Sequence, residues 1–243
     1  MPLIKLSATD STSTYLKELH RRSSQPDYTV VLTHNQTKGR GQLYSQWVSD
    51  PGKNLTFSVL KLFQDLSKNR QFLITIMVSL ALYNVLKHLK VPNITIKWPN
   101  DIMSGSKKIG GILIENTLLK GQIEWTVIGV GLNVNQVGFP NGLNANSLQN
   151  VLGHEMDLDA LLEKILGALR HHLEALESAE WHHWYPIYYQ CLYRKEVVST
   201  FKTPTGQHFS GIITGVAPNG QLCLTLENDE LRYFGLKELK LLN

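Results

Sequence analysis

The chain of 243 residues is poor in cysteine, having only Cys191 and Cys223. A disulfide framework or a zinc site needs more such ligands, so the sequence predicts neither and favours a reducing, cytoplasmic compartment. The N-terminus lacks the apolar run of a signal peptide. The longest apolar stretch, near residues 76–86, falls short of the roughly 20 residues of a membrane span, so no membrane partner is expected.

The chain also has no large excess of charge of one sign. There are 24 basic and 20 acidic side chains, which give a formal net charge of +4. This excess suits an anionic ligand but is too weak to indicate a nucleic-acid partner. With 42% hydrophobic and 18% charged residues, and no repeat or low-complexity tract, the composition predicts a globular protein with a buried core.

Three helices are expected from the spacing of apolar residues. Between about residues 69 and 87 such residues recur at steps of three and four, which predicts a helix with one apolar face. A second helix should begin after Asp157, a suitable N-cap, and bury a leucine-rich stripe over residues 158–176. A shorter helix around Leu16 follows the Ser/Thr-rich run near the N-terminus.

Strands are expected between these helices. Apolar and polar residues alternate at residues 54–60 and 94–98, as in half-buried strands, and residues 109–115 and 125–135 are two further candidates. Mixed strands and helices of this kind predict an α+β fold.

The character of the chain changes after about residue 190. From Glu196 onward, short apolar segments alternate with turn signals such as Pro218-Asn219-Gly220, which predicts a small all-β barrel or sheet. We therefore expect one domain over residues 1–190 and a second over residues 191–243. Pro186 is expected to break the helical pattern just before this boundary.

Two groups of residues near this boundary are more consistent with a packing role than with metal or cofactor binding. Four histidines lie close together, but neighbours on a helix point apart and no cysteine or carboxylate completes a ligand set, so no metal site is expected. Five aromatic residues fall at helical spacing and favour a packing surface between the domains. The histidines are His171, His172, His182 and His183, and the aromatic residues are Trp181, Trp184, Tyr185, Tyr188 and Tyr189.

A glycine-rich segment is the first candidate for ligand binding. Gly39 and Gly41 flank Arg40, so that the backbone could approach an anion while the guanidinium donates to it. Trp47 follows a few residues later. The alternative is a solvated surface loop whose glycines serve turns.

The second candidate is the sequence KWPND, residues 97–101, followed by Lys107 and Lys108 at the start of a strand. This arrangement could place Asn100, Asp101 and a lysine around one spot. Along the second strand Gly111 shares a face with residues 113 and 115. A hairpin with a lysine-rich edge, which discourages aggregation, explains the same pattern.

The third candidate is GVGLNVN, residues 129–135, in which Gly129, Gly131, Asn133 and Asn135 fall on one face of a strand. Glycine weakens a strand, so two on one face indicate that another group approaches the backbone closely. A flat aliphatic chain, another backbone or a closely packed helix could fill that space.

Taken together, these segments resemble the biotin protein ligases, also called biotin–[acetyl-CoA-carboxylase] ligases. The similarity covers nearly the whole chain, in matching order and spacing. The matching segments are DSTS at residues 10–13, Gln36 with the loop from Gly39 to Trp47, KWPND at 97–101, KIGGILIE at 108–115 and GVGLNVN at 129–135. The resemblance implies a mixed-sheet catalytic domain of the biotin/lipoate ligase type, followed by a small SH3-like β-barrel.

The resemblance also assigns roles by position. The residues assigned to biotin are Ser11, Thr12, Ser13, Gln36, Arg40, Gly41, Gln42, Lys108, Gly111, Gly129 and Gly131. The residues assigned to ATP or the adenylate are Gly39, Arg40, Trp47, Asn100, Lys108 and Asn133. The residues assigned to catalysis are Lys108, Arg40 and Asp101.

The implied reaction has two steps. The biotin carboxylate, ionised at pH 7, attacks the α-phosphate of ATP while Lys108, Arg40 and an expected Mg²⁺ relieve the repulsion between the anions. A lysine of a biotin carboxyl carrier protein then attacks the acyl carbon, and Asp101 is the candidate to orient that amine or accept its proton. The resemblance is compatible with a homodimer.

Two departures from the family pattern bear on function. Gln42 stands where many relatives carry a second arginine, so the hold on the adenylate is expected to be looser. The catalytic motifs begin almost at the N-terminus, so we expect no helix-turn-helix domain and no DNA partner. The alternatives are a lipoate- or octanoate-attaching enzyme, a non-catalytic biotin or nucleotide sensor, and an RNA-associated protein.

Overall fold

A computed structural model describes residues 1–42, 45–176 and 180–242. Its main feature is a seven-stranded sheet with the order β1-β2-β3-β7-β6-β5-β4. Only the pairing of β1 with β2 is parallel, so the sheet is mixed. The strands are β1 (Leu3–Thr9), β2 (Val30–Gln36), β3 (Leu55–Ser67), β4 (Ile94–Lys97), β5 (Asp101–Ser104), β6 (Lys107–Leu119) and β7 (Gln122–Leu132).

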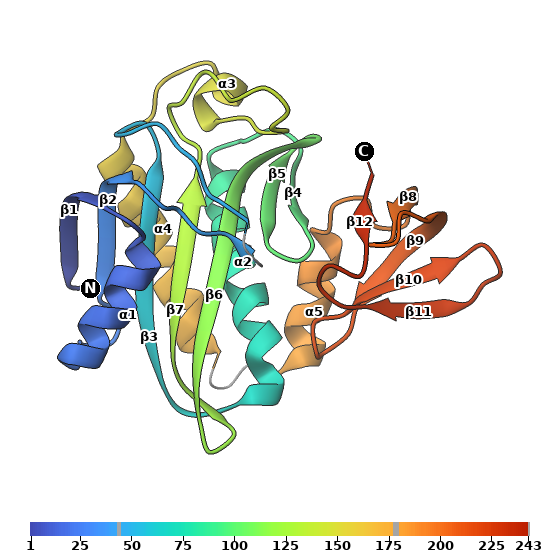
Figure 1. The fold of residues 1–243 in the computed structure, drawn as a ribbon, viewed down its shortest axis with the longest axis horizontal. Coiled ribbons are helices and arrows are strands. Elements are labelled where there is room, and N and C mark those ends of the chain that lie inside the picture. The colour runs from blue at the N-terminus through green and yellow to red at the C-terminus, as the bar shows by residue number, and fades with distance from the viewer. Residues whose placement is uncertain (43–44, 177–179, 243) are drawn as a thin grey trace.

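Helices cover both faces of this sheet (Figure 1). On one face, α2 (Gln71–His88) and α4 (Leu158–Ala175) enclose the main hydrophobic core. On the other face, α1 (Thr12–Arg22) packs with a smaller cluster that includes Leu16 and Leu60. The short helix α3 (Leu148–Leu152) follows β7. The Asp157 carboxylate accepts a hydrogen bond from the Ala160 backbone, so the expected N-cap of α4 is confirmed.

Two predicted patterns of half-burial are wrong. The helix α2 buries residues all round, Ile74, Val78 and Leu82 included, because it lies between the sheet and α4. The strand β3 buries Thr56 and Ser58 as well as its apolar residues, because the face opposite the core is covered by α1. Alternation in the sequence identified the strand but could not show that its polar face would be covered.

The apolar segment that includes α2 is longer than the stretch near residues 76–86 that the sequence indicated. The segment Lys68–His88, which comprises the 3-10 turn η2 (Lys68–Arg70) and α2, has 21 residues and is long and apolar enough to cross a membrane by length and composition alone. However, 61% of its most apolar window is buried inside the protein. Packing against the sheet and α4 accounts for the apolar composition.

Four of the observed strands were not predicted from the sequence. The two N-terminal strands β1 and β2 lie at one edge of the sheet, β5 has four residues, and β12 (Lys240–Leu241) has two. The segments of β5 and β12 are too short to show a period. In β1, polar residues interrupt the apolar ones and most side chains are at least partly exposed, as at the edge of a sheet.

The C-terminal part forms a second, antiparallel sheet with the order β11-β10-β9-β8-β12. Its remaining strands are β8 (Val198–Lys202), β9 (His208–Val216), β10 (Leu222–Leu226) and β11 (Leu231–Phe234). The Trp98 indole, in the turn after β4, donates a hydrogen bond of 2.9 Å to the Gly220 carbonyl. This contact joins the KWPND segment to the turn before β10. The division at residues 190 and 191 stays a prediction.

The helix α5 (Trp181–Gln190) lies between the two sheets (Figure 1). Pro186 lies inside this helix, so the prediction that it breaks the helical pattern is wrong. Aromatic packing holds the helix in place: Trp181 contacts Phe72 of α2, while the Tyr185 hydroxyl lies against Gly215 of β9. These contacts agree with the expected packing role of the aromatic residues.

Tyr188 of α5 is expected to lower the stability of the protein through its hydroxyl. Its hydroxyl is fully buried and has no hydrogen-bond partner among the described residues, and burial raises its pKa. Tyr188→Phe should therefore raise the free energy of unfolding by about 1 kcal/mol in urea titrations, because an unsatisfied polar group is removed. Tyr189→Phe is the matched control, since it removes a hydrogen bond to Glu196 and should lower stability slightly. A large loss in Tyr188→Phe would contradict this account.

Candidate active site

A cavity of about 280 Å³ opens on the face of the large sheet that carries α1. Its floor is formed by β6 and β7, and its walls by the first residues of α1 and the loop after β2. Of the residues predicted for the site, all but Gly39 and Asn133 line this cavity. Those that line it are Ser11, Thr12, Ser13, Gln36, Arg40, Gly41, Gln42, Trp47, Asn100, Asp101, Lys108, Gly111, Gly129 and Gly131.

The first residues of α1 form a buried polar end of the cavity. Ser11 caps the helix, and Thr12 and Ser13 are almost fully buried. The Gln36 side-chain oxygen accepts a hydrogen bond of 2.9 Å from the Thr12 backbone, which joins the end of β2 to the helix. Hydroxyl and amide groups at a helix N-terminus offer both donors and acceptors to a small polar ring.

Ser58 of β3 supports this polar end and was missed in the sequence. Its hydroxyl is fully buried and lies 2.8 Å from the Thr12 hydroxyl and 2.9 Å from the Ser13 hydroxyl. The only signal in the sequence was a serine in an apolar strand, which alternation placed on a solvated face.

The glycines of β6 and β7 form the flat floor. Gly111 pairs with Gly131 across the two strands, and Gly129 pairs with Leu113. A Cβ atom added at Gly129 would lie 2.6 Å from the Ser13 hydroxyl, and one at Gly131 would lie 2.3 Å from the Trp47 ring. The expectation that other groups approach these glycines closely is confirmed.

Trp47 is the group that covers Gly131. Its ring lies over the floor, 5.6 Å from the Lys108 ammonium, and its indole nitrogen is buried without a hydrogen-bond partner among the described residues. The loop carries it there: the Trp47 amide donates to the Gly39 carbonyl at 3.0 Å, and the Gly41 amide donates to the Ser45 carbonyl at 2.8 Å. An indole here occupies part of the floor predicted for an aliphatic tail.

Lys108 reaches the cavity because β6 carries a bulge. Ile102 of β5 pairs with Gly110 and Met103 pairs with Lys108, so Ile109 is an extra residue in β6. Strict alternation would place Lys108 on the face opposite Gly111, but the bulge reverses the alternation at this point. The Lys108 ammonium consequently lies 3.1 Å from the position of a Gly111 Cβ.

Asp101 is the partner of Lys108, with an N–O distance of 2.6 Å and both side chains partly exposed. Asn100 is also fixed: its side-chain amide donates to the Ile112 carbonyl at 2.5 Å, and its own carbonyl accepts from the Ile112 amide at 3.0 Å. The KWPND turn and the lysine therefore meet around one spot, as predicted.

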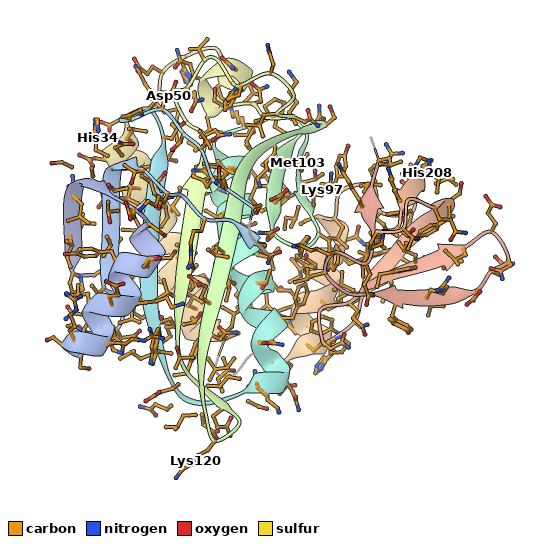
Figure 2. The ribbon with its side chains drawn as sticks, viewed as in Figure 1. His34, Asp50, Lys97, Met103, Lys120 and His208 are labelled. Carbon is orange, nitrogen blue, oxygen red and sulfur yellow. The ribbon has the colours of Figure 1, made fainter. Side chains whose placement is uncertain are left out.

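Lys97, the first residue of KWPND, lies at the boundary between the two sheets (Figure 2). Burial lowers the pKa of its ammonium, and the nearby Asp101 carboxylate acts in the opposite direction. Lys97 does not line the active-site cavity.

The two predicted residues outside the cavity have structural roles. Gly39 packs against the Trp47 backbone, where a Cβ atom would lie 2.1 Å from the Trp47 carbonyl oxygen. Asn133 follows the end of β7 and is buried, and its amide donates to the Asn146 carbonyl at 3.0 Å. The alternation of β7 does not extend to Asn133, because the strand ends at Leu132.

Known proteins match the part of the chain that carries this site. Residues 6–133 match the Biotin/lipoate A/B protein ligase family. The chain is 31% identical over 165 residues to the bifunctional ligase/repressor BirA of Bacillus subtilis, covering 66% of this chain and 49% of that protein. It is 28% identical to the biotin–[acetyl-CoA-carboxylase] ligase of Paracoccus denitrificans over 172 residues, covering 67% and 69% of the two chains.

The fold is similar to that of the Aquifex aeolicus biotin protein ligase solved with biotin and ATP, with a TM-score of 0.81 and 24% identity. That alignment covers 100% of this chain and 99% of the other, and it confirms the expected α+β fold with a small β domain at the C-terminus. The chain spans about half the length of the first curated relatives that it matches. The family match covers more than half of the sequence, and the chain belongs to the biotin/lipoate A/B protein ligase family.

Proposed function

We propose that this protein activates biotin with ATP to form biotinyl-5'-AMP and then transfers the biotinyl group to a lysine of a biotin carboxyl carrier protein. One observation carries the proposal: the glycine floor runs between the polar end at Thr12 and Ser13 and the ammonium of Lys108. A molecule with a small polar ring, an aliphatic tail and a terminal carboxylate fits this order of groups. The names of the relatives support biotin as that molecule.

In the first step, the ionised carboxylate attacks the α-phosphorus of ATP and pyrophosphate leaves. No general base is required, because a carboxylate of ordinary pKa is already ionised at pH 7. The barrier arises from bringing two anions together, and Lys108 lowers it by donating to the oxygens on which charge develops. Asp101, 2.6 Å from Lys108, holds the ammonium at this position.

In the second step, the amine of the carrier lysine attacks the acyl carbon and AMP leaves. The amine must lose a proton to become nucleophilic. Asp101 lines the cavity and is its candidate acceptor or orienting group. Asp101 would thus hold Lys108 in the first step and orient the amine or accept its proton in the second.

Mg²⁺ would enter with ATP rather than occupy a site built by the protein. The described residues contain no group of three His, Cys, Asp or Glu side chains that could hold a metal ion. Mg²⁺ commonly binds through substrate phosphates and water with one or two carboxylates, and Asp101 is the carboxylate that lines the cavity. The two free, buried cysteines support a cytoplasmic location within this proposal.

Biotin-dependent exchange between ATP and labelled pyrophosphate tests the proposal. The protein should catalyse exchange with biotin and be much less active with lipoate or octanoate at equal concentration. Exchange with lipoate or octanoate but not biotin would assign it to the other branch of the family. Binding of biotin without exchange would indicate a sensor.

Ser58→Ala should weaken the affinity for biotin about tenfold, because two buried hydroxyls lose a partner. The rate at saturating biotin should change little, since Ser58 is remote from the carboxylate end. Ser79→Ala is the control: this serine is equally buried, but its hydroxyl has no hydrogen-bond partner among the described residues. Titration calorimetry with biotin alone measures the difference, and equal affinities in the two variants would refute the role of Ser58.

A further inference from the structure

Thr56 of β3 lines the cavity, and its hydroxyl has no hydrogen-bond partner among the described residues. The residue is only 6% exposed. It shares a face of the strand with Ser58, whose hydroxyl lies within hydrogen-bond distance of Thr12 and Ser13. A buried hydroxyl without a partner costs free energy, so in a binding site it indicates where a polar atom of the ligand is expected.

The strand register shows where Thr56 lies along the cavity floor. Ser58 pairs with Gly129, and the Ser13 hydroxyl at the polar end lies directly over this glycine. Thr56 pairs with Gly131, the next glycine along the floor. Residues two apart on a strand are separated by about 7 Å. Thr56 is therefore one step beyond the polar end, in the direction of the proposed tail.

Thr56 lies on the side of the floor opposite Lys108. Gly131 pairs on its other side with Gly111, and the Lys108 ammonium lies 3.1 Å from the position of a Gly111 Cβ. Neighbouring strands are about 4.8 Å apart, so roughly 10 Å separates the backbones of Thr56 and Gly111 across the floor. A carboxylate bound to Lys108 consequently lies on the far side of the floor, and the Thr56 hydroxyl faces the middle of the ligand.

Biotin has one polar atom between its ureido ring and its carboxylate. The ureido ring is fused to a thiolane, whose sulfur is on the side away from the ureido group, and the tail that follows consists of methylenes. A thioether sulfur is a weak hydrogen-bond acceptor, and a hydroxyl can donate to it. With the ureido ring between Thr12 and Ser13, the sulfur is the polar atom that comes beside Thr56.

Trp47 is the other group that could pair with this hydroxyl. Its Cζ3 atom lies 3.5 Å from the position of a Gly111 Cβ, whereas Cε2 lies over Gly131. The indole nitrogen is bonded to Cε2 on the side opposite Cζ3, so it extends toward β3 and Thr56. It is nevertheless buried without a partner among the described residues. Because the ring occupies the floor that the tail needs, biotin displaces it and leaves the Thr56 hydroxyl to the ligand.

We propose that Thr56 is a specificity-determining residue whose hydroxyl donates a hydrogen bond to the ring sulfur of biotin. This inference rests on the proposed function, since it takes biotin as the ligand. The contact favours biotin over a molecule of the same length that lacks the sulfur. Such a molecule leaves the hydroxyl buried and unpaired, which costs free energy that biotin avoids.

Titration calorimetry with biotin and desthiobiotin, in the intact chain and without ATP, tests the contact. Desthiobiotin keeps the ureido ring, the tail and the carboxylate but has no sulfur. Thr56→Val keeps the shape of the side chain and removes the hydroxyl. It should weaken binding of biotin about fivefold, the effect of one neutral hydrogen bond, and change binding of desthiobiotin by less than about twofold. Other differences between the two ligands cancel in this comparison.

Two further variants separate the contact from a general effect on the sheet. Thr56→Ser retains the hydroxyl and should restore the preference for biotin. Thr33→Val is the matched control: Thr33 pairs with Thr56 and is similarly buried, but its hydroxyl donates to the Asn35 carbonyl at 2.9 Å and it does not line the cavity. The ratio of the two affinities should be that of the wild type in Thr33→Val.

Equal losses of biotin and desthiobiotin in Thr56→Val, or no loss of either, would overturn the inference alone. The inference would also be wrong if Thr56→Val no longer altered the preference once Trp47→Phe had removed the indole N–H, since Thr56 would then act through Trp47. Wild-type protein that bound neither ligand would instead overturn the proposed function, and this inference with it.

Discussion

Replacing Lys108 by alanine is expected to lower biotin-dependent ATP–pyrophosphate exchange by about 10³-fold, the effect of removing one preorganised donor from a developing anion. The bulge at Ile109 directs Lys108 into the cavity, and Asp101 fixes its ammonium there. No other lysine lines the cavity among the described residues, so no neighbour can substitute. Affinity for biotin alone should change far less, because the polar ring binds at the opposite end.

The neighbouring Lys107 provides the control. It is exposed and does not line the cavity, so Lys107→Ala should keep exchange within about twofold of wild type, as surface substitutions generally do. If Lys108→Ala retained exchange at a rate similar to that of Lys107→Ala, the assignment of the first step to this ammonium would be wrong.

Asp101→Asn separates the two roles of the carboxylate. A loss of exchange would show that Asp101 acts through Lys108 in the first step. Normal exchange with slow transfer to the carrier would show that it acts on the incoming amine. Normal rates in both steps would remove Asp101 from the mechanism.

The floor of the site could be predicted from the sequence because it depends on strand alternation. Alternate glycines in two neighbouring strands indicated a surface that another group approaches, and the pairing of Gly111 with Gly131 confirms it. The sequence pattern placed a lysine near Asn100 and Asp101, and the family resemblance singled out Lys108. Its face depends on a one-residue bulge, which arises from the pairing of β6 with β5 and leaves no mark in the local pattern.

Some residues of the site were not identified from the sequence because their roles depend on contacts between distant segments. Ser58 and Thr56 read as solvent-facing residues until α1 and the loop after β2 cover that face of β3. Asn133 shows the reverse case: alternation placed it with Gly129 and Gly131, but the strand ends one residue earlier. Local periodicity determines the face of a residue only while the strand continues.

Replacing Gly129 by valine is expected to weaken biotin binding by about 100-fold, near the upper end of the cost of overpacking a fitted site. A Cβ atom at this position would already lie 2.6 Å from the Ser13 hydroxyl, where the tail is proposed to meet the polar ring. The two further methyl groups of valine would fill the tail's path. Gly129→Ala should give a smaller loss, because the Ser13 hydroxyl can rotate away.

Gly138→Val is the matched control, since no atom lies within 4 Å of an added Cβ there. It should bind biotin as the wild type does, and thermal unfolding should show that both variants are folded. Gly131 offers an internal comparison, because the group closest to it is the Trp47 ring on a loop. Gly131→Ala should displace Trp47 and change its fluorescence in the absence of ligand, whereas Gly129→Ala should not. Calorimetry that found normal biotin affinity in Gly129→Val would show that the tail does not cross this glycine floor, and the observation on which the proposed function rests would be lost.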